Sequence, residues 1–403
     1  MQAPVYATAF FTGNVFPMMH VLMPLWALEL TSSPLLIGLI ISSRQLLPIT
    51  LSIHGGALLD RFGPRQVIMV LGVSGALATG LFPVLPFIWA VIALQIVTGF
   101  AETTNWIGVQ SAVGTILKGR PVYAGRMTAA ARLGGFVGPL TAGMAWEALG
   151  PYGGFLFLAA WLSCGSIAAT FLPRHGDASE AASDKPAGAE TPVPKKKADV
   201  MPRLSDYSDT IRLLGLSAIA LVITATFMRQ TGSGIQASFY GVWLKQELGL
   251  TGSTIGLLIG LSNSVSALAA LSIGPLVRRF ADYWLLLVVV ALSIVGIAVT
   301  PMLDTVTLLA IAICIRGAGQ GLNLPLMMSI ASRAVAPTLQ GRVAALRITF
   351  NRLGNALFPL AMGGLAEAVG LENAFYAVGG AGLLLIAALA VWVARSKDQF
   401  KTE

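Results

Sequence analysis

Residues 131–150 read ARLGGFVGPLTAGMAWEALG, and residues 351–370 read NRLGNALFPLAMGGLAEAVG. At one fixed offset the two stretches share an arginine, a proline, a glutamate and several glycines. The matched positions are Arg132/Arg352, Gly134/Gly354, Pro139/Pro359, Gly143/Gly363, Glu147/Glu367 and Gly150/Gly370. A match of these residue types in register is not expected by accident, so the chain is predicted to contain two copies of one unit. The pair Asn105 and Asn323 extends the repeat upstream.

The composition indicates a membrane protein. The 403-residue chain is 55% hydrophobic and 11% charged, with a mean hydropathy of +0.77, whereas soluble domains carry about 25% charged residues. A helix needs about 20 apolar residues to cross the hydrocarbon. Twelve stretches qualify, near 4–28, 34–54, 67–86, 88–116, 127–148, 153–172, 212–243, 253–274, 284–302, 305–332, 343–366 and 372–394. We predict an all-α integral membrane protein with twelve transmembrane helices in two pseudo-symmetric six-helix bundles.

The placement of the basic residues predicts the topology. If the N-terminus is inside and the spans alternate, Lys245 is the one Lys or Arg in the outside segments, although the net charge is +8. This positive-inside bias predicts a multi-pass protein of the cell membrane, most simply a bacterial inner membrane, with both termini cytoplasmic. The charge is therefore a topology signal, and no nucleic-acid partner is expected. The first apolar stretch lacks a basic n-region and a cleavage site, which indicates a retained helix.

One long hydrophilic break divides the chain. Residues 173–211 combine Pro, mixed charge and low hydrophobicity, which predicts disorder. The expected organisation is an N-terminal bundle at 1–172, a cytoplasmic linker at 173–211, a C-terminal bundle at 212–394 and a cytoplasmic tail at 395–403. The linker is interpreted as a flexible tether; the alternative is a regulatory role of Lys195–Lys197 or their contact with anionic lipid.

Two motifs resemble those of a known family. The loop after the span 34–54 reads Gly56-Ala-Leu-Leu-Asp60-Arg61-Phe62-Gly63-Pro64-Arg65. It resembles motif A of the major facilitator superfamily, Gly-x-Leu-Ala-Asp-Arg-x-Gly-Arg-Lys, with Pro64 departing from that pattern. The sequence Gly134-x-x-x-Gly138-Pro139-x-x-Ala142-Gly143 resembles motif C of the family's drug and metabolite antiporters, with Ala142 replacing a Gly. The resemblance covers the whole chain and implies a secondary transporter that works by alternating access, as a monomer.

The motif residues also have physical interpretations. Gly56 and Gly63 permit tight turns and close backbone approach, and Asp60 is placed to pair with a cation, Arg126 by preference, in one conformation. Arg61 and Arg65 are the basic residues of this motif-A-like loop. The alternative interpretation of residues 60–65 is an ordinary solvated loop on the inner side. Glycine and proline in the span 127–148 permit close helix contact and a kink, although a static bundle would use the same packing.

Five arginines lie inside predicted spans. They are Arg44, Arg132, Arg229, Arg316 and Arg352. A central charge costs at least about 2.5–3.5 kcal/mol on insertion scales, so such residues face a protein interior and usually mark function. In the resembling fold the third, sixth, ninth and twelfth helices stand outside the central cavity, and none of those spans carries a buried charge here. An excess of arginine predicts an anionic or zwitterionic solute; structural pairing with neighbouring helices is the alternative.

Proton coupling has two candidate residues. Glu102 is the one acid deep enough to balance the arginines, and a buried carboxyl near Arg can link proton binding to anion binding. A permanent salt bridge is the alternative for Glu102. His20 can also carry a proton, although a packing role is an open alternative. Further substrate contacts are predicted at Asn105, Asn323, Gln320, Trp106 and Tyr240.

These observations predict a secondary active transporter for a small organic anion or zwitterion, coupled to protons. The first alternative is an efflux antiporter for amphiphilic cations or neutral compounds, suggested by motif C. A remote alternative is a non-transporting sensor or assembly factor. The sequence contains no Walker-type loop and no evident Ser-His-Asp set. It also has no His, Cys or carboxylate cluster with the spacing of metal ligands, and its two cysteines, Cys164 and Cys314, both fall inside predicted spans. Neither enzymatic activity nor a cofactor or metal is expected.

Overall fold

The computed structural model describes residues 2–116, 121–173, 212–335 and 339–396, and this part of the chain is helical without β-strands. The first half contains α1 (Gln2–Thr12), α2 (Val15–Leu30), α3 (Pro34–Ser43), α4 (Leu46–Gly80), α5 (Ile88–Ile116) and α6 (Pro121–Thr170). The second half contains η1 (Leu213–Gly215), α9 (Ser217–Ile235), η2 (Gln236–Tyr240), α10 (Gly241–Gln246), α11 (Gly252–Leu271), α12 (Ile273–Val277), α13 (Asp282–Ala298), η3 (Thr300–Met302), α14 (Val306–Ala334), α15 (Gln340–Val369) and α16 (Leu371–Arg395). Nearly all of the predicted linker and most of the predicted tail fall outside the described residues.

These elements form the twelve predicted spans once breaks and fusions are considered. Gly63, at φ 77°, divides α4 into two spans, and Leu149 with Gly150, at φ 60°, divides α6 in the same way. Conversely, α1 and α2 make one span, as do α3 and the first part of α4, α9 with η2 and α10, and α11 with α12. The all-α fold with twelve helices is therefore confirmed.

Fewer than twelve helices in the described part of the chain are both long enough and apolar enough to be recognised as membrane spans by these two criteria alone. Five helical stretches pass that test: Pro34–Leu51, Gly125–Thr170, Gly252–Leu271, Val306–Ala331 and Leu371–Arg395. Helices α1, α2 and α13 are shorter than 18 residues, while α5 and α9 carry polar residues that lower their hydropathy. The twelve spans include these helices because polar interior residues are expected in helices that border a cavity.

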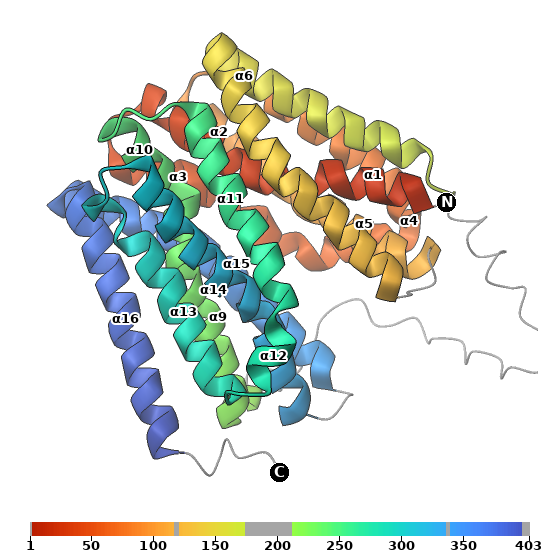
Figure 1. The fold of residues 1–403 in the computed structure, drawn as a ribbon. Coiled ribbons are helices and arrows are strands. Elements are labelled where there is room, and N and C mark those ends of the chain that lie inside the picture. Colours follow the sequence, from red (N-terminus) through yellow and green to blue (C-terminus); the bar gives the residue numbers. More distant parts are fainter. Residues whose placement is uncertain (1, 117–120, 174–211, 336–338, 397–403) are drawn as a thin grey trace, which may run out of the picture.

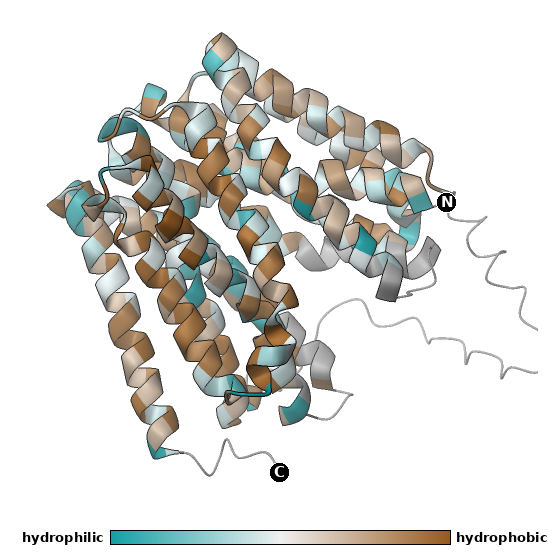
Figure 2. Ribbon diagram, in the orientation of Figure 1, coloured by the Kyte–Doolittle hydropathy of each residue, from teal (hydrophilic) through white to brown (hydrophobic). Residues whose placement is uncertain are grey.

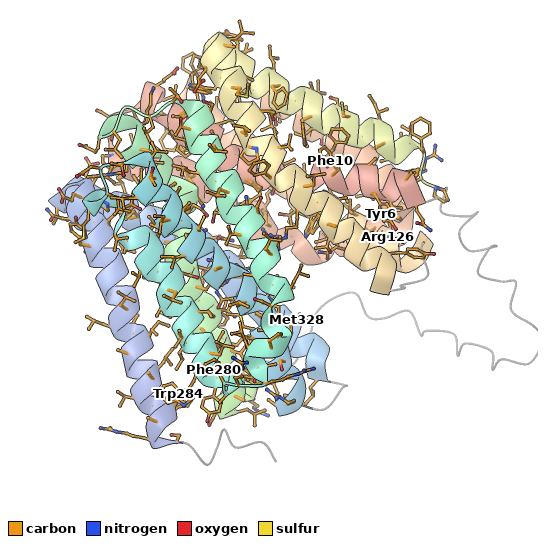
Figure 3. The ribbon with its side chains drawn as sticks, in the orientation of Figure 1. Tyr6, Phe10, Arg126, Phe280, Trp284 and Met328 are labelled. Carbon is orange, nitrogen blue, oxygen red and sulfur yellow. The ribbon has the colours of Figure 1, made fainter. Side chains whose placement is uncertain are left out.

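The two halves meet at one end and diverge at the other (Figure 1). They converge around α2, α10 and the kink of α6, and they separate toward the end where both chain termini lie. Figure 3 shows Tyr6 and Arg126 near that end of the first half, well apart from Phe280 and Trp284 in the second half. We call the end with the termini the terminal end and the other the closed end.

Backbone contact without side chains joins the halves toward the closed end. Helix α6 packs against α11, and α15 packs against α3. A Cβ atom added at Gly143 would lie 2.1 Å from the carbonyl oxygen of Gly252, and one added at Gly363 would lie 2.6 Å from that of Pro34. Distances this short exclude any side chain, so the repeated glycines allow a close approach of the two halves.

The other glycines of the motif-C-like segment pack within the first half. A Cβ at Gly134 would lie 2.6 Å from the carbonyl oxygen of Phe10, and one at Gly138 would lie 3.0 Å from Sδ of Met18. In this conformation these two glycines lie in close contact with neighbouring residues of the first half. The expected kink does not coincide with Pro139, because the non-helical dihedral angles of α6 fall at its division into two spans.

The motif-A-like loop ties two spans of the first half together. Gly63 supplies the left-handed turn that only glycine adopts readily. Arg65 donates from Nη1 to the carbonyl oxygen of Leu172 at 3.0 Å, which satisfies a backbone acceptor beyond the end of α6. The guanidinium of Arg61 lies 5.2 Å from the ring centroid of Phe62.

The expected pair of Asp60 and Arg126 stays a prediction. The side chain of Asp60 and the surroundings of Gly56 lie outside the described residues, although both positions belong to α4. Arg126 is exposed and donates from Nη1 to Oε1 of Gln2 at 3.4 Å.

The outer surface of the bundle is apolar. Large apolar side chains are more than half exposed along two helices: Leu156 and Ile167 on α6, with Phe171 just beyond its end, and Leu384 on α16. Figure 2 shows brown, hydrophobic residues along these helices. Apolar side chains exposed along long helices suit contact with lipid tails, where every backbone group is already paired within its helix.

Candidate functional site

A cavity of about 410 Å³ lies between the two halves. It is lined from the first half by α1, α2, α5 and α6, and from the second half by α9, η2, α11, α14 and α15. Neither α13 nor α16, nor the second span of α4 or of α6, contributes to its wall. This agrees with the prediction that the third, sixth, ninth and twelfth spans stand outside the cavity.

Eight of the predicted site residues line this cavity. They are Glu102, Arg132, Arg229, Arg316, Arg352, Gln320, Trp106 and His20. The wall also contains Thr12, Gly13, Phe16, Pro17, Thr103, Ser233, Gln236, Ile259, Ser262, Asn263, Ser266, Leu324, Asn351 and Asn355. Of these, Gln236, Asn263 and Asn355 are polar residues at mid-depth of a predicted span, where the sequence already suggests contact with a substrate. Most of the polar residues in this group face the cavity from otherwise apolar helices. A polar residue inside a predicted span is therefore the sequence signal that identifies a candidate cavity residue.

Two of the four cavity arginines, Arg229 and Arg316, are partly occupied by neutral partners from their own half. Arg229 on α9 donates from Nη1 to Oε1 of Gln320 at 2.9 Å and from Nη2 to Oδ1 of Asn351 at 3.1 Å. Arg316 on α14 is 5% exposed and donates from Nη1 to Oγ of Ser262 at 3.1 Å, while its buried Nε has no partner in the described part of the chain. A buried donor without an acceptor is costly, so Arg316 favours a ligand that brings one.

The repeat-equivalent arginines approach the cavity from opposite halves. Among the described residues, the Arg132 guanidinium on α6 has no hydrogen-bond or ion-pair partner. Arg352 on α15 donates from Nη1 to Oε1 of Gln45 at 3.2 Å, across the interface between halves. Both therefore retain donors for a ligand oxygen.

Arg44 lies at a break in the second span. Helix α3 ends at Ser43 and α4 begins at Leu46, so Arg44 and Gln45 form a short turn between them. Arg44 turns toward α5, where Nε donates to Oε2 of Glu102 at 3.0 Å and Nη2 forms an ion pair with the same oxygen. Gln45 contacts the other half through Arg352.

Further donors of Arg44 are used within the first half. Nη1 donates to Oε1 of Gln95 at 2.9 Å and to Oγ1 of Thr98 at 3.2 Å. Arg44 faces a small space of about 20 Å³ beside the main cavity, which it shares with His20. The guanidinium is thus committed to Glu102 and its neighbours, which supports the salt-bridge interpretation of Glu102 in this conformation.

Three predicted contact residues point elsewhere. Asn105 and Asn323 are buried, line neither space, and have no hydrogen-bond partner for either side-chain atom in the described part of the chain. Tyr240 is 1% exposed in the core between helices, and its hydroxyl is likewise unpaired there. Asn105 lies instead near Gly72 of α4, in its own half.

Comparison with known proteins identifies the family. A family model described as Major Facilitator Superfamily matches residues 5–228 and 222–403. The tetracycline resistance protein, class C, of Escherichia coli is 24% identical over 334 residues, covering 82% of this chain and 80% of the relative. The uncharacterized MFS-type transporter YceJ of Bacillus subtilis (strain 168) is 23% identical over 353 residues, covering 85% and 83%.

Solved structures share the fold. The nucleoside transporter NupG superposes with a TM-score of 0.79 at 13% identity, covering 100% of this chain and 99% of that one. A bacterial homolog of the human lysosomal transporter Spinster, in an inward-facing and unoccupied conformation, gives a TM-score of 0.74 at 16% identity, covering 100% and 98%. With twelve helices and a family match across both halves, this chain belongs to the Major Facilitator Superfamily, as a multi-pass membrane transporter and not an enzyme.

Proposed function

We propose that this protein is a secondary active transporter for a small organic anion or zwitterion, driven by protons. The observation that carries the proposal is the charge of the cavity: it is lined by Arg132, Arg229, Arg316 and Arg352, and its one acid, Glu102, is paired with Arg44. Among the described residues no other carboxylate reaches these arginines. A desolvated guanidinium favours carboxylate, sulfonate or phosphate oxygens as partners.

The same proposal includes the orientation and the domain plan. Both termini are cytoplasmic, the bundles at 1–172 and 212–394 flank the linker, and the protein works as a monomer in the cell membrane. The terminal end is then the inner face, so the conformation is open inward and sealed outside. The two halves would rock about the cavity in alternating access.

The substrate class is tested by thermal stability of the purified protein in detergent. A ligand that binds the folded state raises the melting temperature by mass action. The panel contains citrate, glutamate, benzoate and taurine as anionic or zwitterionic probes, tetraphenylphosphonium as a cation, and uridine as a neutral solute. We expect shifts from the first group. A shift from tetraphenylphosphonium alone would overturn the anion proposal.

Proton coupling is tested by Glu102→Gln. Glu102 lines the cavity while its Oε2 holds Arg44, so protonation would release the guanidinium for a substrate oxygen. In proteoliposomes we expect Glu102→Gln to lose uptake driven by a pH gradient but to retain exchange between internal and external substrate. Glu247→Gln, at an exposed site after α10, is the control. Unchanged gradient-driven uptake by Glu102→Gln would remove this residue from the mechanism.

A second candidate function is drug or metabolite efflux. Its support is the similarity to a protein named for tetracycline resistance and the motif-C-like segment of α6. A deletion strain that becomes hypersensitive to lipophilic cations would favour it.

A further inference from the structure

Two glutamates at equivalent repeat positions lie beyond the cavity, toward the closed end. Glu147 belongs to the first span of α6, and Glu367 lies near the end of α15. Each follows a contact glycine, Gly143 or Gly363, by four residues, so glutamate and glycine share one face of their helix. Neither glutamate lines the cavity.

Glu147 binds the start of a helix in the opposite half. Helix α11 begins at Gly252, and the backbone N–H of Ser253 donates to Oε1 of Glu147 at 2.8 Å. The first N–H groups of a helix have no partner within the helix, and its N-terminus carries a partial positive charge. A carboxylate from the first half therefore satisfies a helix end of the second half.

Glu367 makes the mirror contact. Helix α3 begins at Pro34, and Oε2 of Glu367 accepts from Oγ of Ser33 at 2.8 Å and from the backbone N–H of Leu35 at 3.3 Å. Here the second half provides the carboxylate and the first half provides the helix end. The two halves thus exchange equivalent contacts.

Both contacts require the halves to be in close apposition. They extend the glycine interface, where the backbones at Gly143 and Gly252, and at Gly363 and Pro34, leave no room for a Cβ atom. A rocking motion that opens this end must pull each carboxylate away from the N–H groups of the opposite half. The interaction is then gained only in the state that is closed here, which is the condition for biasing a two-state equilibrium.

We propose that Glu147 and Glu367 act as a symmetric pair of latches that holds the closed end shut and sets the ratio of outward-open to inward-open protein. They are positioning residues, since neither of them lines the cavity. The proposal rests on the proposed alternating-access function, and it adds the residues that determine which state is preferred when the cavity is empty.

The test measures opening of the closed end without any substrate. In intact cells, a protein that lacks both native cysteines and carries Ile259→Cys, a cavity position on α11, is treated with a membrane-impermeant maleimide. The labelling rate scales with the fraction of outward-open protein. We expect Glu147→Gln and Glu367→Gln each to raise this rate about fivefold to tenfold, and the double variant to raise it by about the product, because the two sites are separate.

Two controls separate a latch from a mere structural cap. Glu247→Gln, an exposed carboxylate at the same end, is expected to leave the labelling rate unchanged. The melting temperature of each variant is measured in parallel. A double variant that melts lower but is labelled at the starting rate would overturn the proposal, and so would a rate equal to that of the control.

The outcome is independent of the substrate. Labelling that rises in the double variant supports the latch even if no anion in the panel stabilises the protein, which would reject the proposed substrate class alone. Stabilisation by anions together with an unchanged labelling rate would reject the latch alone.

Discussion

Arg316→Met is expected to weaken binding of the stabilising anion by about 100-fold or more. A hydrogen bond to a charged group contributes about 1.5–3 kcal/mol, and the guanidinium offers its unpaired Nε together with Nη donors to one ligand oxygen or two. Arg316 is 5% exposed, and its side chain has Ser262 as its one hydrogen-bond partner among the described residues. Concentration-dependent thermal shifts measure the change in dissociation constant.

The matched substitutions define what Arg316 contributes. Arg395→Met, at the exposed last residue of α16, removes the same charge far from the cavity and is expected to leave affinity unchanged. Arg316→Lys keeps the charge but loses the planar fork, so an intermediate affinity is expected. Wild-type affinity in Arg316→Met would show that the anion does not contact this residue.

Arg44→Met is expected to destabilise the folded protein by about 3–5 kcal/mol. Removing one partner of a buried ion pair leaves the other charge uncompensated, which is the costly case. Glu102 would lose its cation, and Gln95 and Thr98 would lose their donor. The measurement is the midpoint of thermal unfolding in detergent, compared with that of Arg395→Met.

The double variant Arg44→Met/Glu102→Leu supplies the decisive comparison. Replacing a whole buried pair with apolar side chains is often neutral or stabilising, so the double variant is expected to melt above Arg44→Met alone. If Arg44→Met alone melts like wild type, the pair does not stabilise this conformation, and the assignment of Arg44 to Glu102 fails.

The sequence predicted the fold because its signals are long and repeated. Twelve apolar stretches and one in-register repeat determine the number of spans and the two halves, and the depth of an arginine within a span predicts that it faces an interior. Depth does not determine the face of the helix. Asn105 and Trp106 are neighbours on α5, yet Trp106 lines the cavity and Asn105 is buried beside α4.

Interruptions within a span and contacts between the two halves were harder to predict from the sequence. Pro48 has no N–H to donate to the carbonyl of Arg44, four residues earlier, which favours the interruption between α3 and α4. Other helices, however, contain Pro24, Pro139 and Pro325 without ending there, so the break could not be inferred from a proline alone. The pairing of Arg44 with Glu102 depends on a neighbouring helix some 58 residues away. The sequence shows Glu147 and Glu367 only as matched positions of the repeat. A repeat indicates that two residues are equivalent, but it does not indicate which residues of the other half they contact.

For the proposed anionic substrate, the four arginines of the cavity would also affect how quickly the ligand arrives. A concave site lined by charges of one sign focuses its field and raises the local concentration of oppositely charged solutes, which accelerates association by 10- to about 1,000-fold at low ionic strength. Because the screening length is about 8 Å at physiological salt, added chloride slows capture and competes for the same guanidinium groups. Transport rates of this protein should therefore fall steeply with salt at low substrate concentration and much less at saturation.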